Sequence, residues 1–301
     1  MEKVIFIGGT SYSGSTMLDM ILANDPKGYS LGEINALFRP YRKHHFEEIE
    51  RLKKDDKWRK ILKAGENELY KNLFRYFPEI DFFVDSSKNP LWINKHIKIL
   101  VNKNIEVKNV CIFKTPVEIA YSFNKRGLSN QWERTWENYH RLYFALISDF
   151  KTVAYKDLVN NDTTLKKLCE YLEIPFFETK KNFWEKQHQT FFGNNRARIH
   201  TNNLNSEGEE KLDLSKRKDE YRKIYYEEVH DKDFISSVIK IMDRNNNLEK
   251  ISSILENYNI LNENVDNNSL LTKSIVFNAY SIKLRKINEI LSILKAKICI
   301  L

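Results

Sequence analysis

Apolar runs that end in polar turns recur along the first half of the chain, and amphipathic stretches follow them. The first run, residues 4–7, ends in two glycines and a hydroxyl-rich turn, and a helical apolar stripe then runs from near Ser15 to the turn at 24–26. The later predicted strands and helices are residues 82–90 (strand and turn), 91–101, 107–114, 117–126, 131–150, 152–158 (strand and turn) and 163–172. This alternation predicts an α/β fold, a P-loop-like parallel β-sheet flanked by helices and joined by right-handed crossovers.

The remaining stretches have weaker patterns. Residues 29–40 are too apolar for a surface loop and too few for a full element, while the dense charges of residues 41–65 are typical of a solvated helical face. From residue 245 the composition becomes rich in asparagine, which suggests a connector, and residues 273–301 carry an amphipathic helical stripe. We therefore divide the chain into a main domain, residues 1–244, and a helical C-terminal extension, residues 245–301.

Composition and charge limit the classes of binding partner and the cellular compartment that we expect. The 49 basic and 41 acidic residues give a formal charge of +8, which favours phosphorylated or polyanionic partners, but no recognition motif or basic helix points to nucleic acid. The three scattered cysteines lack metal-binding spacing and are expected to be buried thiols in a reducing compartment. The first strand starts too early for a signal peptide, and no apolar run is long enough to span a bilayer, so we expect a cytoplasmic protein.

The turn after the first strand has the spacing of a phosphate-binding loop. Gly9 is followed after four residues by Gly14, Ser15 and Thr16, with serine where a P-loop has lysine. Backbone N–H groups and a helix N-terminus there can hold an anion, but the missing lysine argues against ATP; an ordinary tight turn is the alternative. The predicted anion-binding residues of this loop are Ser11, Tyr12, Ser13, Gly14, Ser15 and Thr16.

A second polar group follows the strand at 107–114. Lys114 ends this strand, and Ser122 lies in the next predicted helix, which starts near Pro116. A strand-end cation and a hydroxyl group in the following helix converge on one point, where they can hold a phosphate. The alternative is that both side chains simply face solvent.

Together these residues resemble the sulfotransferases that use 3′-phosphoadenosine 5′-phosphosulfate (PAPS), in particular the bacterial and carbohydrate branches. In that family an SGST or SGTT loop holds the 5′-phosphosulfate, and residues 13–16 match it. A later Arg-x-Pro with a serine eight residues after the arginine holds the 3′-phosphate, and Lys114, Pro116 and Ser122 match that pattern with lysine in place of arginine. Further resemblances follow in the same order, so that about residues 3–200 are covered, at 31–33, 85–88, 136–139, 153–158 and 188–196.

The resemblance implies an activity and a set of partners. It implies that residues 1–244 form a catalytic domain that transfers a sulfuryl group from PAPS to an acceptor hydroxyl, with 3′,5′-adenosine bisphosphate as product and no metal. We expect the acceptor to be a sugar in a glycan or glycolipid on family analogy alone. The acceptor pocket would be formed by residues 35–80 and 125–145, with residues 200–235 as a further contribution.

Two positions depart from the family pattern. The family commonly has lysine or arginine where this chain has Tyr12, and Lys88 is our candidate for the missing cation, against an ordinary surface or capping lysine. Lysine at position 114 cannot make the bidentate contact of arginine, and a nearby arginine would have to compensate. The candidate arginines are Arg126, Arg196 and Arg198. The polar, cationic loop at 187–200 can close over an anion, and Gly193 and Asn194 of this loop are further predicted cofactor-binding residues.

Transfer to a hydroxyl group requires a general base. We favour Glu33, because the resemblance places it near the first loop, and His188 and His140 are the competing candidates. Two other functions stay open: a degenerate P-loop kinase, and a non-enzymatic protein that binds anions or membranes. For the helix at 273–301, packing on the domain or in a homo-oligomer is favoured over peripheral membrane binding, because lysines alternate with its apolar positions.

Overall fold

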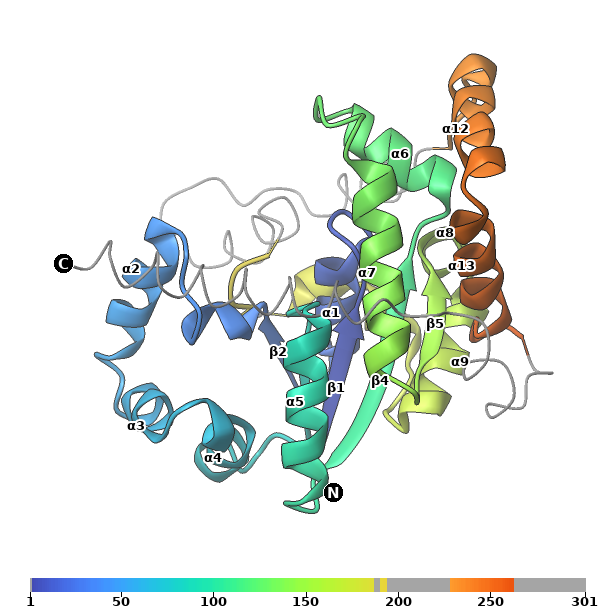
Figure 1. The fold of residues 1–301 in the computed structure, drawn as a ribbon. Coiled ribbons are helices and arrows are strands. Elements are labelled where there is room, and N and C mark those ends of the chain that lie inside the picture. The colour runs from blue at the N-terminus through green and yellow to red at the C-terminus, as the bar shows by residue number, and fades with distance from the viewer. Residues whose placement is uncertain (1, 187–189, 194–227, 263–301) are drawn as a thin grey trace, which may run out of the picture.

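A parallel sheet forms the centre of the computed structural model, which describes residues 2–186, 190–193 and 228–262 (Figure 1). Within these residues the sheet has five strands in the order β2-β3-β1-β4-β5. The strands are β1 (Lys3–Gly8), β2 (Gly28–Gly32), β3 (Phe82–Asp85), β4 (Glu106–Phe113) and β5 (Lys151–Ala154), and every neighbouring pair is parallel. The predicted α/β fold with a parallel sheet is therefore confirmed.

Helices cover both faces of the sheet (Figure 1). The α-helices are α1 (Ser15–Leu22), α2 (Lys43–Leu52), α3 (Asp56–Ala64), α4 (Leu69–Tyr76), α5 (Pro90–Val101), α6 (Pro116–Asn124), α7 (Trp132–Leu146), α8 (Tyr155–Asn160), α9 (Asp162–Leu172), α12 (Lys232–Arg244) and α13 (Asn246–Asn257). Short 3₁₀ helices are η1 (Ile34–Leu37), η2 (Glu66–Glu68), η3 (Glu178–Lys181) and η4 (Phe183–Glu185).

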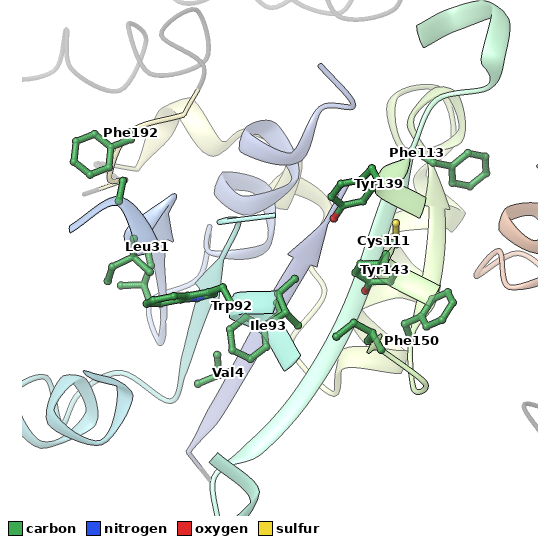
Figure 2. Packing of buried hydrophobic residues seen from close by; sticks show 14 of the residues in the cluster. Val4, Leu31, Trp92, Ile93, Cys111, Phe113, Tyr139, Tyr143, Phe150 and Phe192 are labelled. Carbon is green, nitrogen blue, oxygen red and sulfur yellow. The ribbon is translucent and has the colours of Figure 1, made fainter. Parts of the chain in front are cut away.

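The central strand is buried on both faces, which explains its continuous apolar run. Val4 and Phe6 of β1 pack in a cluster with residues of α5 and α7, whereas Ile5 and Ile7 pack in a second cluster with α1 and α9. Figure 2 shows the first cluster, in which Trp92 and Ile93 of α5 lie above Val4. Cys111 of β4 belongs to that cluster and Cys169 of α9 to the other, and both are buried free thiols as predicted.

Several predictions for individual segments were wrong. Residues 29–40, predicted to be too short for an element, contain most of β2 and all of η1. The turn predicted after the fourth strand is the start of helix α8. The charged stretch 41–65, in contrast, forms α2 and α3 with largely exposed charged faces, as predicted, and their inner faces bury Leu52, Trp58 and Ile61.

The asparagine-rich stretch after residue 244 contains a helix instead of a connector. Helix α13 packs against α7 and β5 and buries Leu248, Ile251 and Leu255. The division of the chain at residue 244 stays a prediction, and the helix predicted for 273–301 lies outside the described residues. In the part of the chain that the structure describes, no helix is long and apolar enough to cross a membrane.

The parallel arrangement brings the candidate residues to one edge of the sheet. The segments that follow β1, β3 and β4 leave at the carboxyl ends of neighbouring strands, which is where open α/β sheets bind ligands. Helix α6 starts there with Pro116 at its first turn and with a reciprocal cap between Thr115 and Glu118. This cap fixes the direction in which the chain leaves β4 beside the first loop.

Candidate functional site

The loop after β1 is a tight turn that ends at the N-terminus of α1. Gly14 is the N-terminal cap of α1 at φ 99°, so no side chain caps the first N–H groups, and the first turn has no acidic residue. The hydroxyl groups of Thr10 and Ser13 are buried, and neither has a hydrogen-bond partner among the described residues. A buried helix N-terminus with uncompensated hydroxyl groups fits an anion such as a phosphate.

The side chains of Lys114 and Ser122 meet next to the carboxyl end of β4. Lys114 Nζ donates to Ser122 Oγ at 3.1 Å, and Ser122 Oγ donates to the Glu118 carbonyl at 2.9 Å. Burial lowers the pKa of Lys114 to about 8. The predicted convergence of Lys114 and Ser122 is confirmed, while their role in phosphate binding stays a prediction.

The ring of Tyr155 joins the loop to this lysine. Lys114 Nζ lies 4.5 Å from the centroid of the Tyr155 ring. The same ring leaves no room at the loop, because a Cβ at Gly14 would lie only 2.4 Å from Tyr155 Cδ2. The helix N-terminus and the Lys114 ammonium group therefore both contact one aromatic ring.

Tyr12 and Arg126 contact each other at the outer side of the loop. The Arg126 guanidinium carbon lies 4.1 Å above the Tyr12 ring, and its Nη1 donates to the Ser122 carbonyl. Tyr12 also packs edge-on against Phe123 at 5.1 Å. Arg126 therefore lies beside the Lys114 and Ser122 pair, and its role as the arginine that compensates for the lysine stays a prediction.

Glu33 and Lys88 form an ion pair at the ends of β2 and β3. Lys88 Nζ donates to Glu33 Oε1 at 2.5 Å, and both side chains are largely shielded. Lys88 adopts a left-handed backbone conformation, φ 61°, which is unusual for a residue with a side chain. The structure thus brings the predicted base and the candidate cation together.

A short segment of the late loop packs between Glu33 and the first loop. The Phe191 carbonyl accepts from the Glu33 N–H at 2.7 Å, and Phe191 forms a bridge with Gly32. Gly193, at φ 90°, lies so close to the first loop that a Cβ there would be 2.9 Å from Thr16 Oγ1. Gly193 thus lies at the predicted site, while His188, Asn194, Arg196 and Arg198 are outside the described residues.

Solved structures similar to this chain include several sulfotransferases. The sulfotransferase domain from the curacin biosynthetic pathway matches with a TM-score of 0.51 and 16% identity, over 85% of this chain and 98% of that domain. This chain has the sulfotransferase fold. The sulfotransferase domain of the Synechococcus PCC 7002 olefin synthase matches with a TM-score of 0.49 and 19% identity, over 80% of this chain and 94% of that one.

A sulfotransferase from Mycobacterium avium matches with a TM-score of 0.35 and 10% identity, over 60% of this chain and 66% of that one. No protein-family model and no curated protein matches the sequence. The predicted resemblance to sulfotransferases is confirmed at the level of the fold.

Sequence reasoning missed one residue that supports the candidate site, the buried Asp19 of α1. Asp19 Oδ2 accepts from the Gly32 N–H at 3.0 Å and from Ser86 Oγ at 2.6 Å. Complete burial raises the pKa of Asp19 to about 7. Because Glu33 directly follows Gly32 and Lys88 lies two residues after Ser86, this carboxyl group ties both ends of the ion pair to α1. A polar residue in the apolar stripe of α1 was the available signal.

His140, a competing base in the prediction, is a buried residue of α7. Its ring Nδ1 lies 2.8 Å from the Trp136 carbonyl, and it packs against the Trp136 ring. Burial lowers its pKa to about 3, so the ring is neutral at neutral pH, but it is fully shielded from any acceptor. His140 is therefore a core residue of the sulfotransferase fold and is rejected as the base.

Proposed function

We propose that the protein is a PAPS-dependent sulfotransferase that transfers a sulfuryl group to an acceptor hydroxyl, in a sugar of a glycan or glycolipid. The observation that carries this proposal is the ring of Tyr155, which contacts Gly14 at the start of α1 and also lies under the Lys114 ammonium group. A nucleotide with phosphates on both the 3′ and the 5′ position needs two anion sites close to each other. The Tyr155 contacts support such a pair, because they bring the helix N-terminus and the Lys114 ammonium group close to each other.

The described residues fit the two phosphate groups of PAPS. Residues 11–16 would hold the 5′-phosphosulfate with backbone N–H groups of the loop and of α1, and with the hydroxyl groups of Ser13, Ser15 and Thr16. Lys114 and Ser122 would hold the 3′-phosphate, with Arg126 beside them. When bound, PAPS supplies a sulfuryl group on a good leaving phosphate, so the transfer yields 3′,5′-adenosine bisphosphate.

Glu33 is the proposed general base, and Lys88 is the proposed cation that stabilises the departing phosphate. As the acceptor oxygen forms its bond to sulfur and the bond from sulfur to the phosphate oxygen breaks, Glu33 takes the hydroxyl proton. The Lys88 ammonium group, 2.5 Å from Glu33, holds this carboxylate in one orientation and offers positive charge to the departing phosphate. His188 remains the competing base, and Gly193, Asn194, Arg196 and Arg198 remain the proposed cover of the anion.

The proposal includes neither a metal nor a nucleic acid. Among residues 2–186, 190–193 and 228–262, no three or more His, Cys, Asp or Glu side chains gather in a way that could hold a metal ion, and the metal-free reaction stays a prediction. The cytoplasmic location and a homo-oligomer or membrane contact through residues 273–301 likewise stay predictions.

The proposed reaction is tested by incubating the protein with labelled PAPS and a panel of glycans and small alcohols. Label should move to at least one hydroxyl-bearing acceptor. We expect Glu33→Gln to reduce this transfer by about 10²- to 10⁴-fold while binding of 3′,5′-adenosine bisphosphate is kept, because the amide cannot accept the proton. Glu170→Gln, an exposed residue of α9 outside the proposed sites, is the matched control and should retain full activity. Full activity of Glu33→Gln would exclude Glu33 as the base.

A further inference from the structure

Tyr12 occupies an unusual backbone conformation next to the anion loop. Its φ of 70° lies in the left-handed region, which costs a residue with a bulky side chain about 1 kcal/mol or more. Such a conformation persists where contacts hold the side chain in place. The Tyr12 ring packs edge-on against Phe123 of α6 at 5.1 Å, and it also carries the Arg126 guanidinium on its face at 4.1 Å. A residue of the first loop thus docks onto α6 and the turn that follows it.

The Arg126 side chain is fixed at two points. Its Nη1 donates to the Ser122 carbonyl, and its guanidinium carbon lies over the Tyr12 ring, 4.1 Å from the ring centroid. Ser122 is also the residue whose hydroxyl accepts from Lys114 Nζ at 3.1 Å. Two cations of different geometry therefore meet at Ser122, one as a point charge and the other as a planar fork.

The contact with Tyr12 and the hydrogen bond of Nη1 leave other in-plane N–H donors of the guanidinium for a ligand. Stacking on an aromatic ring uses the face of the group, whereas its N–H donors lie in the plane and match two oxygens of a phosphate. Arg126 is exposed, in contrast to the half-shielded Lys114. Lys88, the other candidate cation, is already paired with Glu33 at 2.5 Å.

Building on the proposed function, we propose that Tyr12 is a positioning residue that holds the Arg126 guanidinium at the 3′-phosphate subsite formed by Lys114 and Ser122. A residue of the 5′ loop then sets the selectivity for nucleotides that carry a 3′-phosphate. The bidentate contact that Lys114 cannot make is supplied by Arg126, and Tyr12 supplies the platform that keeps Arg126 oriented before the nucleotide arrives.

Calorimetric titration with two probes tests this role. We would measure the dissociation constants of adenosine 3′,5′-bisphosphate and of adenosine 5′-monophosphate, which lacks the 3′-phosphate. Tyr12→Leu should weaken binding of the bisphosphate about five- to tenfold, the range expected from loss of a cation–π contact, and should leave the monophosphate within about twofold. Tyr12→Phe keeps the ring and is the matched control, with both constants unchanged.

Variants of the arginine keep the test independent of the loop. Arg126→Gln and Arg126→Lys leave Tyr12 in place and should produce the same selective loss. In the double variant Tyr12→Leu with Arg126→Gln, the loss should not exceed that of Arg126→Gln alone, because the two residues act through one contact.

Several outcomes would overturn the assignment. Equal weakening of both probes by Tyr12→Leu would mean that Tyr12 only maintains the loop, and unchanged binding of the bisphosphate by Arg126→Gln would mean that Arg126 does not touch the 3′-phosphate. These results require that the unaltered protein binds the bisphosphate. Absence of that binding in the unaltered protein would instead refute the proposed function itself, and this inference with it.

Discussion

Replacement of Asp19 by asparagine tests how the buried carboxyl group of α1 supports the site. The folded protein raises the pKa of Asp19 from 3.8 to about 7 because the group is completely buried. A carboxyl group with a raised pKa in the folded state binds its proton more tightly there than in the unfolded chain. The wild-type free energy of unfolding therefore falls, through this group, as the pH rises from about 4 to about 7.

The magnitude follows from the shift. While Asp19 is still protonated in the folded protein and ionised in the unfolded chain, each pH unit lowers the wild-type free energy of unfolding by about 1.4 kcal/mol. Between pH 5 and pH 7 the decrease amounts to about 2 kcal/mol. The amide oxygen of an asparagine at this position can still accept from the Gly32 N–H and from Ser86 Oγ, which Asp19 Oδ2 does at 3.0 and 2.6 Å. Asp19→Asn should therefore gain stability relative to the wild type by about 2 kcal/mol over this pH range.

Urea unfolding of both proteins at several pH values measures this difference. Asp56→Asn, which removes an exposed carboxylate paired with Arg59, is the control and should show a difference from the wild type that does not change above about pH 5. A difference between Asp19→Asn and the wild type that is constant, or that shrinks as the pH rises, would refute the reasoning.

Two further predictions concern the anion site. Because burial lowers the pKa of Lys114 to about 8, the ligand-free site loses this positive charge as the pH rises above 8. The affinity for 3′,5′-adenosine bisphosphate, measured by titration calorimetry, should therefore fall about tenfold between about pH 8 and about pH 9.5. Lys114→Arg should abolish this decline, and a decline that persists in it would contradict the assignment. Gly14→Ala should lower the free energy of unfolding by about 3 kcal/mol, because the added Cβ would lie 2.4 Å from the Tyr155 ring. Gly127 also has a positive φ but open space around it, so Gly127→Ala should lower the free energy of unfolding by only about 1 kcal/mol in the same urea assay. Equal costs for the two glycine variants would show that Tyr155 does not confine the loop.

The central elements could be predicted because their signals are local. The apolar run of β1, the glycines of the following turn and the apolar stripe of α1 lie within one short stretch of sequence. Likewise, Lys114 and Ser122 are separated by only eight residues, so strand and helix geometry alone brings them together. Sequence therefore predicted the parallel sheet and the edge of the sheet that carries the candidate site.

Other parts depend on contacts between distant segments. Strand β2, with its two glycines, has little strand propensity of its own, and it is a strand because it pairs with β3. The same is true of Asp19, whose partners come from β2 and from the turn after β3. Tyr12 and Arg126 are 114 residues apart, as their numbers show, and no local pattern connects them.

His140 shows the opposite error. A histidine in an aromatic-rich helix suggests chemistry, but the packing of α7 against the sheet buries its ring completely. Helical periodicity placed the helix correctly, yet it did not identify the face of α7 that is covered, because the helices that contact α7, namely α5 and α13, are distant in the sequence.

Calorimetric titration of the unaltered full-length protein with 3′,5′-adenosine bisphosphate, and separately with ATP and Mg²⁺, tests the central claim most directly. The proposed function predicts binding of one bisphosphate per chain with a dissociation constant on the order of micromolar, and binding of ATP with Mg²⁺ that is at least about tenfold weaker. Tight binding of ATP with Mg²⁺ together with no binding of the bisphosphate would contradict it.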